Sequence, residues 1–337
     1  MSSVMQHVVT ICPSGISFSV STDTTILSSA LANNIVLEHS CGTGQCGACK
    51  AKVLRGDVAS DDPHGALSEE EKASGVVLTC TSRPLSALEL EAEYYPELAS
   101  IVKKTVPCKV AELTFPVADV AVLRLRLPPT AQFSFLPGQY IDLTAQGVTR
   151  SYSVASACVE NNQLELHIRQ VPGGQFSDIV FNQLKPEQLL RMNGPHGSFF
   201  IREESRPLIF LAGGTGFAPV KAMVEALLAK GDRRAIHIYW GQRHASGVYS
   251  SLLGEWAAQY DHIQAHVVVS DDASWTGRRG MVHEAVLADI PDLSGYAVYA
   301  CGSPAMIATA KSAFIQQGLN EKAFYADAFL PAVTQRG

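Results

Sequence analysis

Four cysteines in the first quarter of the chain have the spacing of an iron–sulfur site. The first three form C-x4-C-x2-C on one short loop, and the fourth follows about thirty residues later; they are Cys41, Cys46, Cys49 and Cys80. This is the plant-type [2Fe–2S] spacing, in which four thiolates hold two irons. Structural zinc favours paired C-x2-C knuckles, and a disulfide framework favours exported chains, so both are weaker interpretations. We expect Gly42, Gly44 and Gly47 to take positive φ and to turn backbone N–H groups toward the sulfurs.

The middle of the chain carries two clusters suited to an anionic ligand with a flat ring. In Arg150–Ser153, the arginine can bind a phosphate, the tyrosine offers a stacking face and the serine offers a hydroxyl. Strand alternation would put Arg150 and Tyr152 on one face. His167 and Arg169 precede Gly173–Ser177, which we expect to open a helix at Ser177 whose N–H groups hold a pyrophosphate. The alternative for the first cluster is an exposed arginine beside a core tyrosine.

Two glycine-containing turns follow apolar runs in the last third of the chain. Gly213–Pro219 comes after the run 207–212, and Cys301–Met306 comes after 296–301. In open α/β sheets, ligands bind at the carboxyl ends of such strands. Pro219 stands where the third glycine of G-x-G-x-x-G would be, so an ordinary strand–helix turn is the alternative.

The elements needed to position these motifs fall into three segments. In residues 1–98, the sequence pattern predicts a hairpin of two strands (8–12 and 16–20) followed by a helix (25–33). It also predicts two further strands (51–54 and 88–92) and a short helix that begins at Ser68. Residues 99–203 predict an antiparallel barrel with strands 120–127, 139–143, 149–154 and 164–169. Residues 206–337 alternate strands (207–212, 237–240, 265–269, 296–301) with helices, typical of a doubly wound parallel sheet. The fold class is therefore multidomain α+β and α/β, with a flexible linker expected at 95–106 around Lys103 and Lys104.

Composition and charge narrow the function classes. The 337 residues carry a net charge of −6, which disfavours nucleic-acid binding. No apolar run is long enough to span a bilayer and no secretory signal is evident, so we expect a cytoplasmic protein. Residues 1–98 hold five basic and twelve acidic side chains, which indicates either a docking surface or an ordinary solvated face. Cys12, Cys108 and Cys158 lack metal spacing and are expected to be buried apolar residues.

The order of these motifs resembles the ferredoxin-NADP reductase superfamily with an N-terminal plant-type ferredoxin domain, over essentially the whole chain. Within it, four stretches are similar to the CDP-6-deoxy-Δ3,4-glucoseen reductases, a group that serves 3,6-dideoxyhexose synthesis; they are Tyr94–Leu98, Leu127–Thr130, Arg150–Val154 and Trp275–Gly277. The resemblance implies a β-grasp ferredoxin domain, an antiparallel flavin-binding β-barrel and a doubly wound nicotinamide-nucleotide domain.

The resemblance also implies roles for individual residues. Arg150 would bind the FAD phosphate, Tyr152 would stack on the isoalloxazine and Ser153 would lie near its N5. Cys301 would place its thiol beside the nicotinamide C4, so Cys301, Tyr152 and Ser153 are the expected catalytic residues. The remaining expected cofactor contacts are His167, Arg169, Gly174, Ser177, Gly213, Gly214, Thr215, Gly216, Gly302 and Phe329.

The function implied is a reductase that passes electrons from NADH through FAD and a [2Fe–2S] cluster to a partner protein. The partner expected from the closer resemblance is a pyridoxamine-phosphate-dependent CDP-sugar 3-dehydrase. The alternatives are the reductase component of an aromatic-ring or other oxygenase and a freestanding NAD(P)H diaphorase or flavin reductase. NADPH is the alternative nucleotide. Relatives that use NADPH place an arginine and a hydroxyl after the second strand of this domain, and here Gln242 and Arg243 precede Tyr249. Relatives specific for NADH often have an acidic residue in this region, and Gly247 is not acidic. The turns Gly213–Pro219 and Cys301–Met306 argue against a non-enzymatic iron–sulfur sensor, because such a protein would lack a nicotinamide-nucleotide site.

Overall fold

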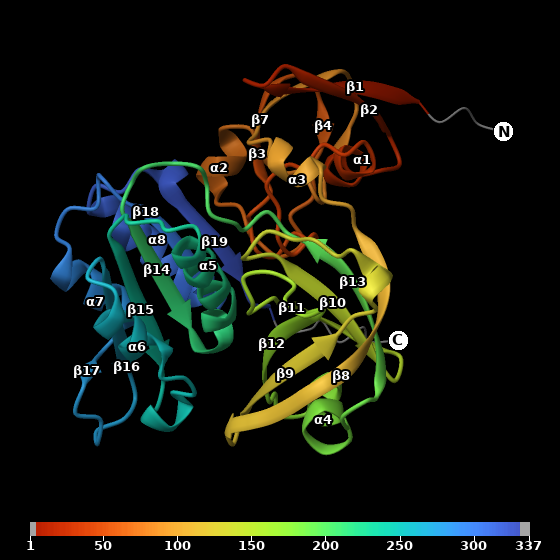
Figure 1. Cartoon of the computed structure of the whole chain (residues 1–337). Helices are drawn as coiled ribbons and strands as arrows, with labels where there is room; N and C mark the ends of the chain where they lie inside the picture. The colour runs from red at the N-terminus through yellow and green to blue at the C-terminus, as the bar shows by residue number, and fades with distance from the viewer. Residues whose placement is uncertain (1–4, 331–337) are drawn as a thin grey trace. The chain divides into compact units, whose positions relative to one another are not determined.

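The computed structural model describes residues 5–330, and the chain divides into two compact units between Val102 and Lys103. Figure 1 shows the chain from red at the N-terminus to blue at the C-terminus. The first unit contains the cysteine loop, and the second contains the barrel and the parallel sheet. Each unit is described by itself.

The first unit is a mixed five-stranded sheet packed against a helix. Its strand order is β2-β1-β7-β3-β5, with β1 and β7 parallel and the other neighbours antiparallel. This confirms the predicted β-grasp arrangement. The strands are β1 (Gln6–Cys12), β2 (Ile16–Ser21), β3 (Lys50–Arg55), β5 (Val76–Leu78) and β7 (Leu88–Glu91), with a small ladder of β4 (Val58–Ala59) and β6 (Arg83–Pro84).

Two helices of this unit have side-chain caps at their first turns. Thr25 caps α1 (Ile26–Ala32) by accepting a hydrogen bond from the Ser28 N–H. Ser68 and Glu71 form a reciprocal capping box at α2 (Glu69–Ala73), as the sequence predicts. The third helix, α3 (Pro96–Ala99), lies inside the segment 95–106 that was expected to be a flexible linker.

That linker expectation is wrong for most of its length. Strand β8 (Lys104–Val117) begins at Lys104, whose ammonium donates to the carbonyls of Ala131 and Gln132. Only residues 100–103 therefore lie between α3 and β8 in the described chain. Lys104 is held in the barrel and is not part of a free pivot.

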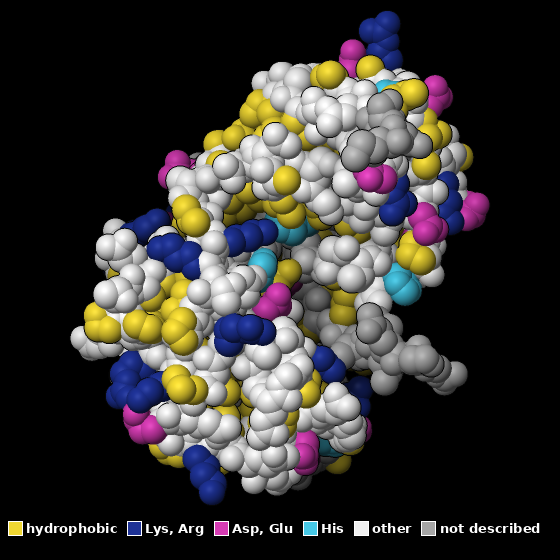
Figure 2. All heavy atoms as spheres, turned by 90° about the vertical axis from the view of Figure 1, so that its right-hand side faces the viewer, with side chains coloured by type: hydrophobic (Ala, Val, Ile, Leu, Met, Phe, Trp, Pro, Cys, Tyr) yellow, Lys and Arg dark blue, Asp and Glu magenta, His cyan; other side chains and the backbone are white. Residues whose placement is uncertain are grey.

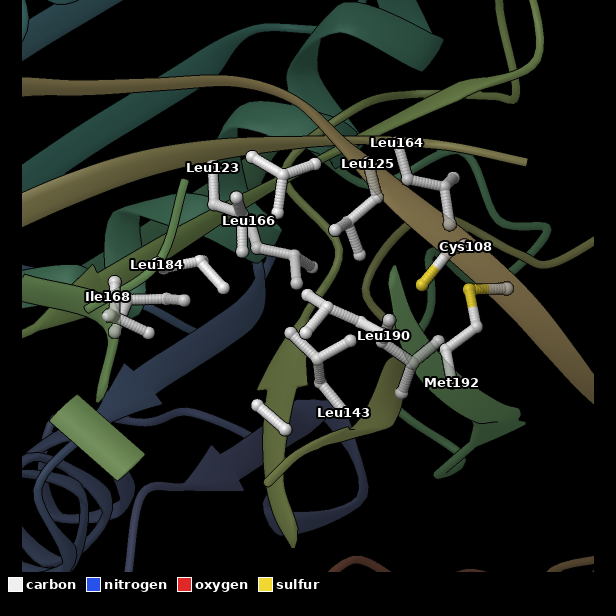
Figure 3. Packing of buried hydrophobic residues seen from close by; sticks show 14 of the residues in the cluster. Cys108, Leu123, Leu125, Leu143, Leu164, Leu166, Ile168, Leu184, Leu190 and Met192 are labelled. Atoms are coloured by element: carbon white, nitrogen blue, oxygen red, sulfur yellow. The ribbon is translucent and has the colours of Figure 1, made fainter. Parts of the chain in front are cut away.

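The barrel is a six-stranded antiparallel sheet that nearly closes on itself. Its order is β11-β10-β13-β8-β9-β12, and an antiparallel bridge between Val154 and Leu166 links the two ends. The further strands are β9 (Val120–Arg126), β10 (Tyr140–Ala145), β11 (Val148–Ser153), β12 (Gln163–Arg169) and β13 (Leu189–His196), with helix α4 (Gln175–Asn182). Figure 3 shows leucines from these strands surrounding the sulfurs of Cys108 and Met192. Cys108 is buried as predicted, whereas Cys158 is exposed and Cys12 is half-buried, contrary to expectation.

The last part of the second unit is a parallel sheet with helices on its faces (Figure 1). The order is β17-β16-β15-β14-β18-β19, so β14 and β18 are neighbours and both glycine turns leave the same edge. The strands are β14 (Leu208–Gly213), β15 (Ile236–Gln242), β16 (Ile263–Val269), β17 (Arg278–Arg279), β18 (Ala297–Gly302) and β19 (Phe324–Ala328). The helices are α5 (Phe217–Ala229), α6 (Leu252–Gln259), α7 (Val282–Asp289) and α8 (Pro304–Gln316). The predicted doubly wound domain is confirmed.

On the face shown in Figure 2, several Lys and Arg side chains lie near one another at the left, and the acidic side chains are scattered among uncharged ones. Within residues 5–330, no helix has both the length and the apolar character needed to cross a bilayer.

Candidate functional site

The four predicted metal-binding thiols lie in two close pairs. The sulfurs of Cys49 and Cys80 are 3.1 Å apart. Cys41 and Cys46 form the other pair, and the backbone N–H of each approaches the sulfur of the other at 3.5 and 3.4 Å. Within the described chain, no three His, Cys, Asp or Glu side chains converge as they would on one metal ion. All eight cysteines are free.

The backbone of the cysteine loop is turned toward the sulfurs. Gly42, Gly44 and Gly47 have φ of 68°, 81° and 70°, as predicted. The N–H groups that follow Gly42 and Gly47 point at sulfurs. The Thr43 N–H donates to the Cys41 sulfur at 3.4 Å, and the Ala48 N–H donates to the Cys46 sulfur at 3.5 Å. Within this coupled pair, hydrogen bonding from Cys46 lowers the pKa of Cys41 to about 4, and the same bond raises the pKa of Cys46, so the negative charge is favoured on Cys41.

Strand β11 presents its predicted residues on alternating faces. Tyr152 is half-buried against Phe176, with ring centroids 5.4 Å apart, and burial raises its pKa. Arg150 donates to its neighbour's carbonyl, that of Thr149. Ser153 is buried and donates to Asp327 of β19 at 3.4 Å, which joins the barrel to the parallel sheet. Arg150 and Tyr152 therefore share a face and Ser153 points away from it.

Helix α4 begins two residues earlier than predicted. Its N-cap is Gly174, which makes no side-chain cap, so Ser177 lies within the first turn. The Ser177 hydroxyl instead bonds back to the carbonyls of Val171 and Gly174, at 3.1 and 3.0 Å, and fixes the preceding loop. A cavity of about 320 Å³ lies at this helix start, lined by residues 170–175, Ser177 and Asp178. A side chain at Gly174 would clash with Val171 and Ser177.

His167 and Arg169 lie where the barrel meets the parallel sheet. Both ring nitrogens of buried His167 have partners: Tyr249 at 3.0 Å and Glu165 at 3.1 Å. Burial lowers the pKa of His167 and favours its neutral form. The Arg169 guanidinium donates to Gln242 at 3.3 Å and lies beside Gly214. The structure thus brings Arg169 to the glycine turn that follows β14, and the expected cofactor contacts of both residues stay predictions.

Close backbone approach explains the glycines at the two turns. A Cβ on Gly216 would lie 2.3 Å from the Cys301 carbonyl oxygen, and one on Gly302 would lie 3.1 Å from the Gly213 Cα. Only glycine permits this contact between the ends of β14 and β18. Gly214, at φ 56°, and Thr215 form a 3-10 turn ahead of α5, and the Trp240 indole donates to the Gly214 carbonyl at 2.8 Å.

Cys301 is fully buried at the end of β18, in contact with this turn. Its register partner on β19 is Asp327, and burial together with that carboxylate raises the pKa of the thiol. The Phe329 N–H donates to the Gly302 carbonyl at 2.8 Å. Ser153, Asp327 and Cys301 therefore connect strand β11 with the glycine turn.

Three domain-family models match successive segments of the chain. Residues 9–85 match the 2Fe-2S iron-sulfur cluster binding domain, 107–201 the oxidoreductase FAD-binding domain and 210–312 the oxidoreductase NAD-binding domain. A Yersinia pseudotuberculosis protein named CDP-6-deoxy-L-threo-D-glycero-4-hexulose-3-dehydrase reductase is 53% identical over 95% of this chain and 97% of its own. The chain belongs to the ferredoxin-NADP reductase family with a 2Fe-2S domain.

Other relatives of this reductase serve oxygenases. A terephthalate 1,2-dioxygenase reductase component from Comamonas is 34% identical over 98% of this chain and 99% of its own. The crystal structure of the cytochrome P450 reductase GcoB from Amycolatopsis has a TM-score of 0.78 and 29% identity, with 96% of this chain and 99% of that chain covered. This reductase is an NAD(P)H-dependent oxidoreductase that uses a [2Fe–2S] cluster, FAD and a nicotinamide nucleotide.

The residues of the reductase fit these groups. Two thiol pairs suit two irons that take two cysteines each, and a single-metal site would need three or more converging ligands. The cavity at the uncapped start of α4 suits an anionic diphosphate, because the first N–H groups of a helix lack intrahelical partners. The tight contact of Gly216 with the Cys301 carbonyl leaves no room for a side chain at this point of the turn.

Sequence reasoning missed several residues of this site. Lys221, Glu165 and Trp240 contact the predicted residues or their loops, yet each belongs to an unremarkable local pattern. Their contacts join segments far apart in the chain, so no short-range spacing could reveal them. For β19, the local sequence offered one clue, which was the acidic residue Asp327 two positions before Phe329.

Proposed function

We propose that this reductase supplies single electrons, taken as pairs from NADH, to a pyridoxamine-phosphate-dependent CDP-sugar 3-dehydrase. The observation that carries the reductase chemistry is the contact of Ser153 with Asp327, which brings strand β11 to the end of β18 beside Cys301. The dehydrase is supported by the 53% identity to a reductase of that name. The 34% identity to a dioxygenase reductase supports an oxygenase as the second candidate acceptor.

The proposed residue roles follow from position. Cys41 and Cys46 would hold one iron, and Cys49 and Cys80 the other. For FAD, Tyr152 would offer its ring and Ser153 its hydroxyl, while Arg150 and the N–H groups after Gly174 would bind phosphates. The nucleotide would be held by the turn Gly213–Gly216 with Arg169, and its reactive ring would lie by Cys301. Gly302 and Phe329, which are joined by a backbone hydrogen bond, would contact the same ring.

The protein's own contribution is placement and exclusion of water. When bound, the three groups convert the two-electron chemistry of a nicotinamide into the one-electron chemistry of an iron–sulfur cluster. Burial raises the pKa of the Cys301 thiol and keeps it neutral, so it would bring a polarisable sulfur without charge to the end of β18. No general base is required, and none of the proposed roles moves a proton.

Further proposals concern boundaries, nucleotide and compartment. We assign residues 1–98 to the ferredoxin domain, 99–203 to the flavin barrel and 206–337 to the nucleotide domain. NADH is the proposed donor, with NADPH as the alternative. We also propose a cytoplasmic location, in line with the free thiols of Cys12, Cys108, Cys158 and Cys301.

Reconstitution tests the acceptor. Purified reductase, NADH, the dehydrase and its CDP-hexulose substrate are combined, and the deoxygenated sugar nucleotide is measured by chromatography and mass spectrometry. We expect product only when reductase and dehydrase are both present. Turnover with a terephthalate-type oxygenase, and none with the dehydrase, would instead support the second candidate. A reductase active only toward free flavin or dyes would reject both.

The acidic first unit predicts salt-dependent transfer to the acceptor. Residues Glu69 and Glu70 of α2 are exposed, while Glu71 bonds Lys50 at 2.6 Å and completes the capping box. We therefore expect Glu69→Lys with Glu70→Lys to slow acceptor reduction about tenfold at low salt and to leave NADH–ferricyanide turnover unchanged. The effect should fade between about 0.01 and 0.15 M salt, as the Debye length shortens from about 30 to 8 Å.

The matched control is Glu203→Lys, an exposed acid of the second unit. It should leave acceptor reduction within about twofold of wild type, the range of an ordinary surface change. If acceptor reduction is indifferent to salt and to the double reversal, the acidic face is only solvated.

A further inference from the structure

Alternate side chains of β12 point from the barrel toward the nucleotide domain, and each bonds to a side chain there. The three pairs are Glu165–Lys221 at 3.2 Å, His167–Tyr249 at 3.0 Å and Arg169–Gln242 at 3.3 Å. Because side chains two apart on a strand share a face, the row is a direct consequence of the strand's register. The row makes β12 a natural place to fix the barrel against the nucleotide domain.

Lys221 differs from the other partners because it also reaches the flavin strand. Its ammonium donates to the Ala155 carbonyl at 3.1 Å, two residues beyond Ser153 at the end of β11. Lys221 lies in the second turn of α5, which follows directly from the nucleotide turn that ends at Gly216. One side chain therefore links the segment after β11, strand β12 and the helix that carries the nucleotide turn.

The pair Lys221–Glu165 is built as a buried charge contact. The exposed fractions of the two side chains are 13% and 12%. Burial alone would raise the pKa of Glu165, but the hydrogen bond from His167 and the Lys221 charge hold it at about 2. Glu165 also binds the Arg124 guanidinium at 3.2 Å, so it keeps partners when Lys221 is replaced. Lys221 has one further partner, Glu225 on its own helix, at 2.9 Å.

We infer that Lys221 is a positioning residue, which holds α5 and the nucleotide turn in register with the flavin strand through Glu165 and the Ala155 carbonyl. The inference rests on the proposed function for the reaction that it serves. Lys221 lies beyond the turn expected to bind the nucleotide, so its loss should change alignment and leave affinity intact. Misalignment of reacting groups by about 1 Å costs up to about a hundredfold in rate.

The test replaces Lys221 with methionine, which keeps the aliphatic stem and removes the charge and donors. For Lys221→Met we expect flavin reduction by saturating NADH to slow by about ten- to a hundredfold in anaerobic stopped flow. The dissociation constant for NAD⁺ and the FAD content should stay within about twofold of wild type. Independently of turnover, amides of residues 153–157 should exchange with deuterium about tenfold faster, because their anchor on α5 is gone.

Controls make each outcome decisive. Lys311→Met removes a 2.8 Å pair with Glu321 inside the nucleotide domain and should change neither rate nor exchange. Lys221→Arg keeps charge and donors and should recover most of the rate. Weaker NAD⁺ binding with a normal saturated rate would make Lys221 a binding residue and overturn the inference. Unchanged rate and exchange, or equal losses in Lys311→Met, would also overturn it. If NADH does not reduce the flavin of the wild-type protein, the proposed function fails. The hydrogen-exchange rates would still test whether Lys221 holds residues 153–157 in place.

Discussion

Replacing Cys46 with serine should abolish cytochrome c reduction while NADH–ferricyanide turnover stays within about twofold of wild type. Cys46 belongs to one of the two thiol pairs and accepts a hydrogen bond from the Ala48 N–H. The variant loses one of four thiolates, and the cluster chemistry requires thiolate ligands. The second unit has its own cores and carries the proposed flavin and nucleotide residues, so it should remain intact.

Three measurements accompany that variant. Wild-type protein should contain about two irons per chain, and the variant clearly fewer, while both retain FAD. Cys12→Ser, a half-buried thiol outside the cysteine loop, is the control and should keep both activities. Loss of both activities in a variant that still holds FAD would contradict the order in which we place the groups.

Removing the Cys301 thiol should slow flavin reduction by NADH by about tenfold to a thousandfold, the scale expected when a reacting group is misplaced. Cys301 is fully buried, and its carbonyl lies where a Cβ on Gly216 would clash. Alanine preserves that backbone contact and removes only the sulfur. The loss therefore reports the thiol's place beside the nucleotide, and anaerobic stopped-flow bleaching of the flavin measures it.

The matched control for Cys301→Ala is Cys108→Ala. Cys108 is also buried, in the barrel core (Figure 3), which is a different hydrophobic cluster from the one that contains Cys301. It should lose some stability and keep its rate of flavin reduction. FAD content should be retained in both variants. If Cys301→Ala reduces its flavin at the wild-type rate, Cys301 is only a buried apolar thiol.

The parts of the fold with strong local signals were predictable. The capping box at Ser68 and the glycine-rich cysteine loop depend on neighbours within a few residues, and both formed as expected. Strand β8 was not anticipated, because Pro107 and Pro116 interrupt its pattern; its long pairing with β9 and β13 compensates. The start of α4 was misplaced because Ser177 looks like a capping residue while its hydroxyl bonds backward to the loop.

The site was predictable by motif and not by contact. Cys301 and Ser153 could be named from their local sequence, but their connection through Asp327 depends on β19 pairing with β18. An aspartate inside a short apolar strand weakens the pattern that would reveal that strand. Lys221 shows the same limit, because an ordinary lysine on an amphipathic helix gives no sign of a partner fifty-six residues earlier in the chain.

The short connection between α3 and β8 has a kinetic consequence. Four residues, 100–103, can span roughly 14 Å even when fully extended. So short a tether keeps each unit at an effective concentration of millimolar order or higher near the other. Exchange between the units is therefore first-order and unaffected by dilution. Transfer to a separate acceptor protein is second-order, so its rate rises with the concentration of that acceptor and falls on dilution.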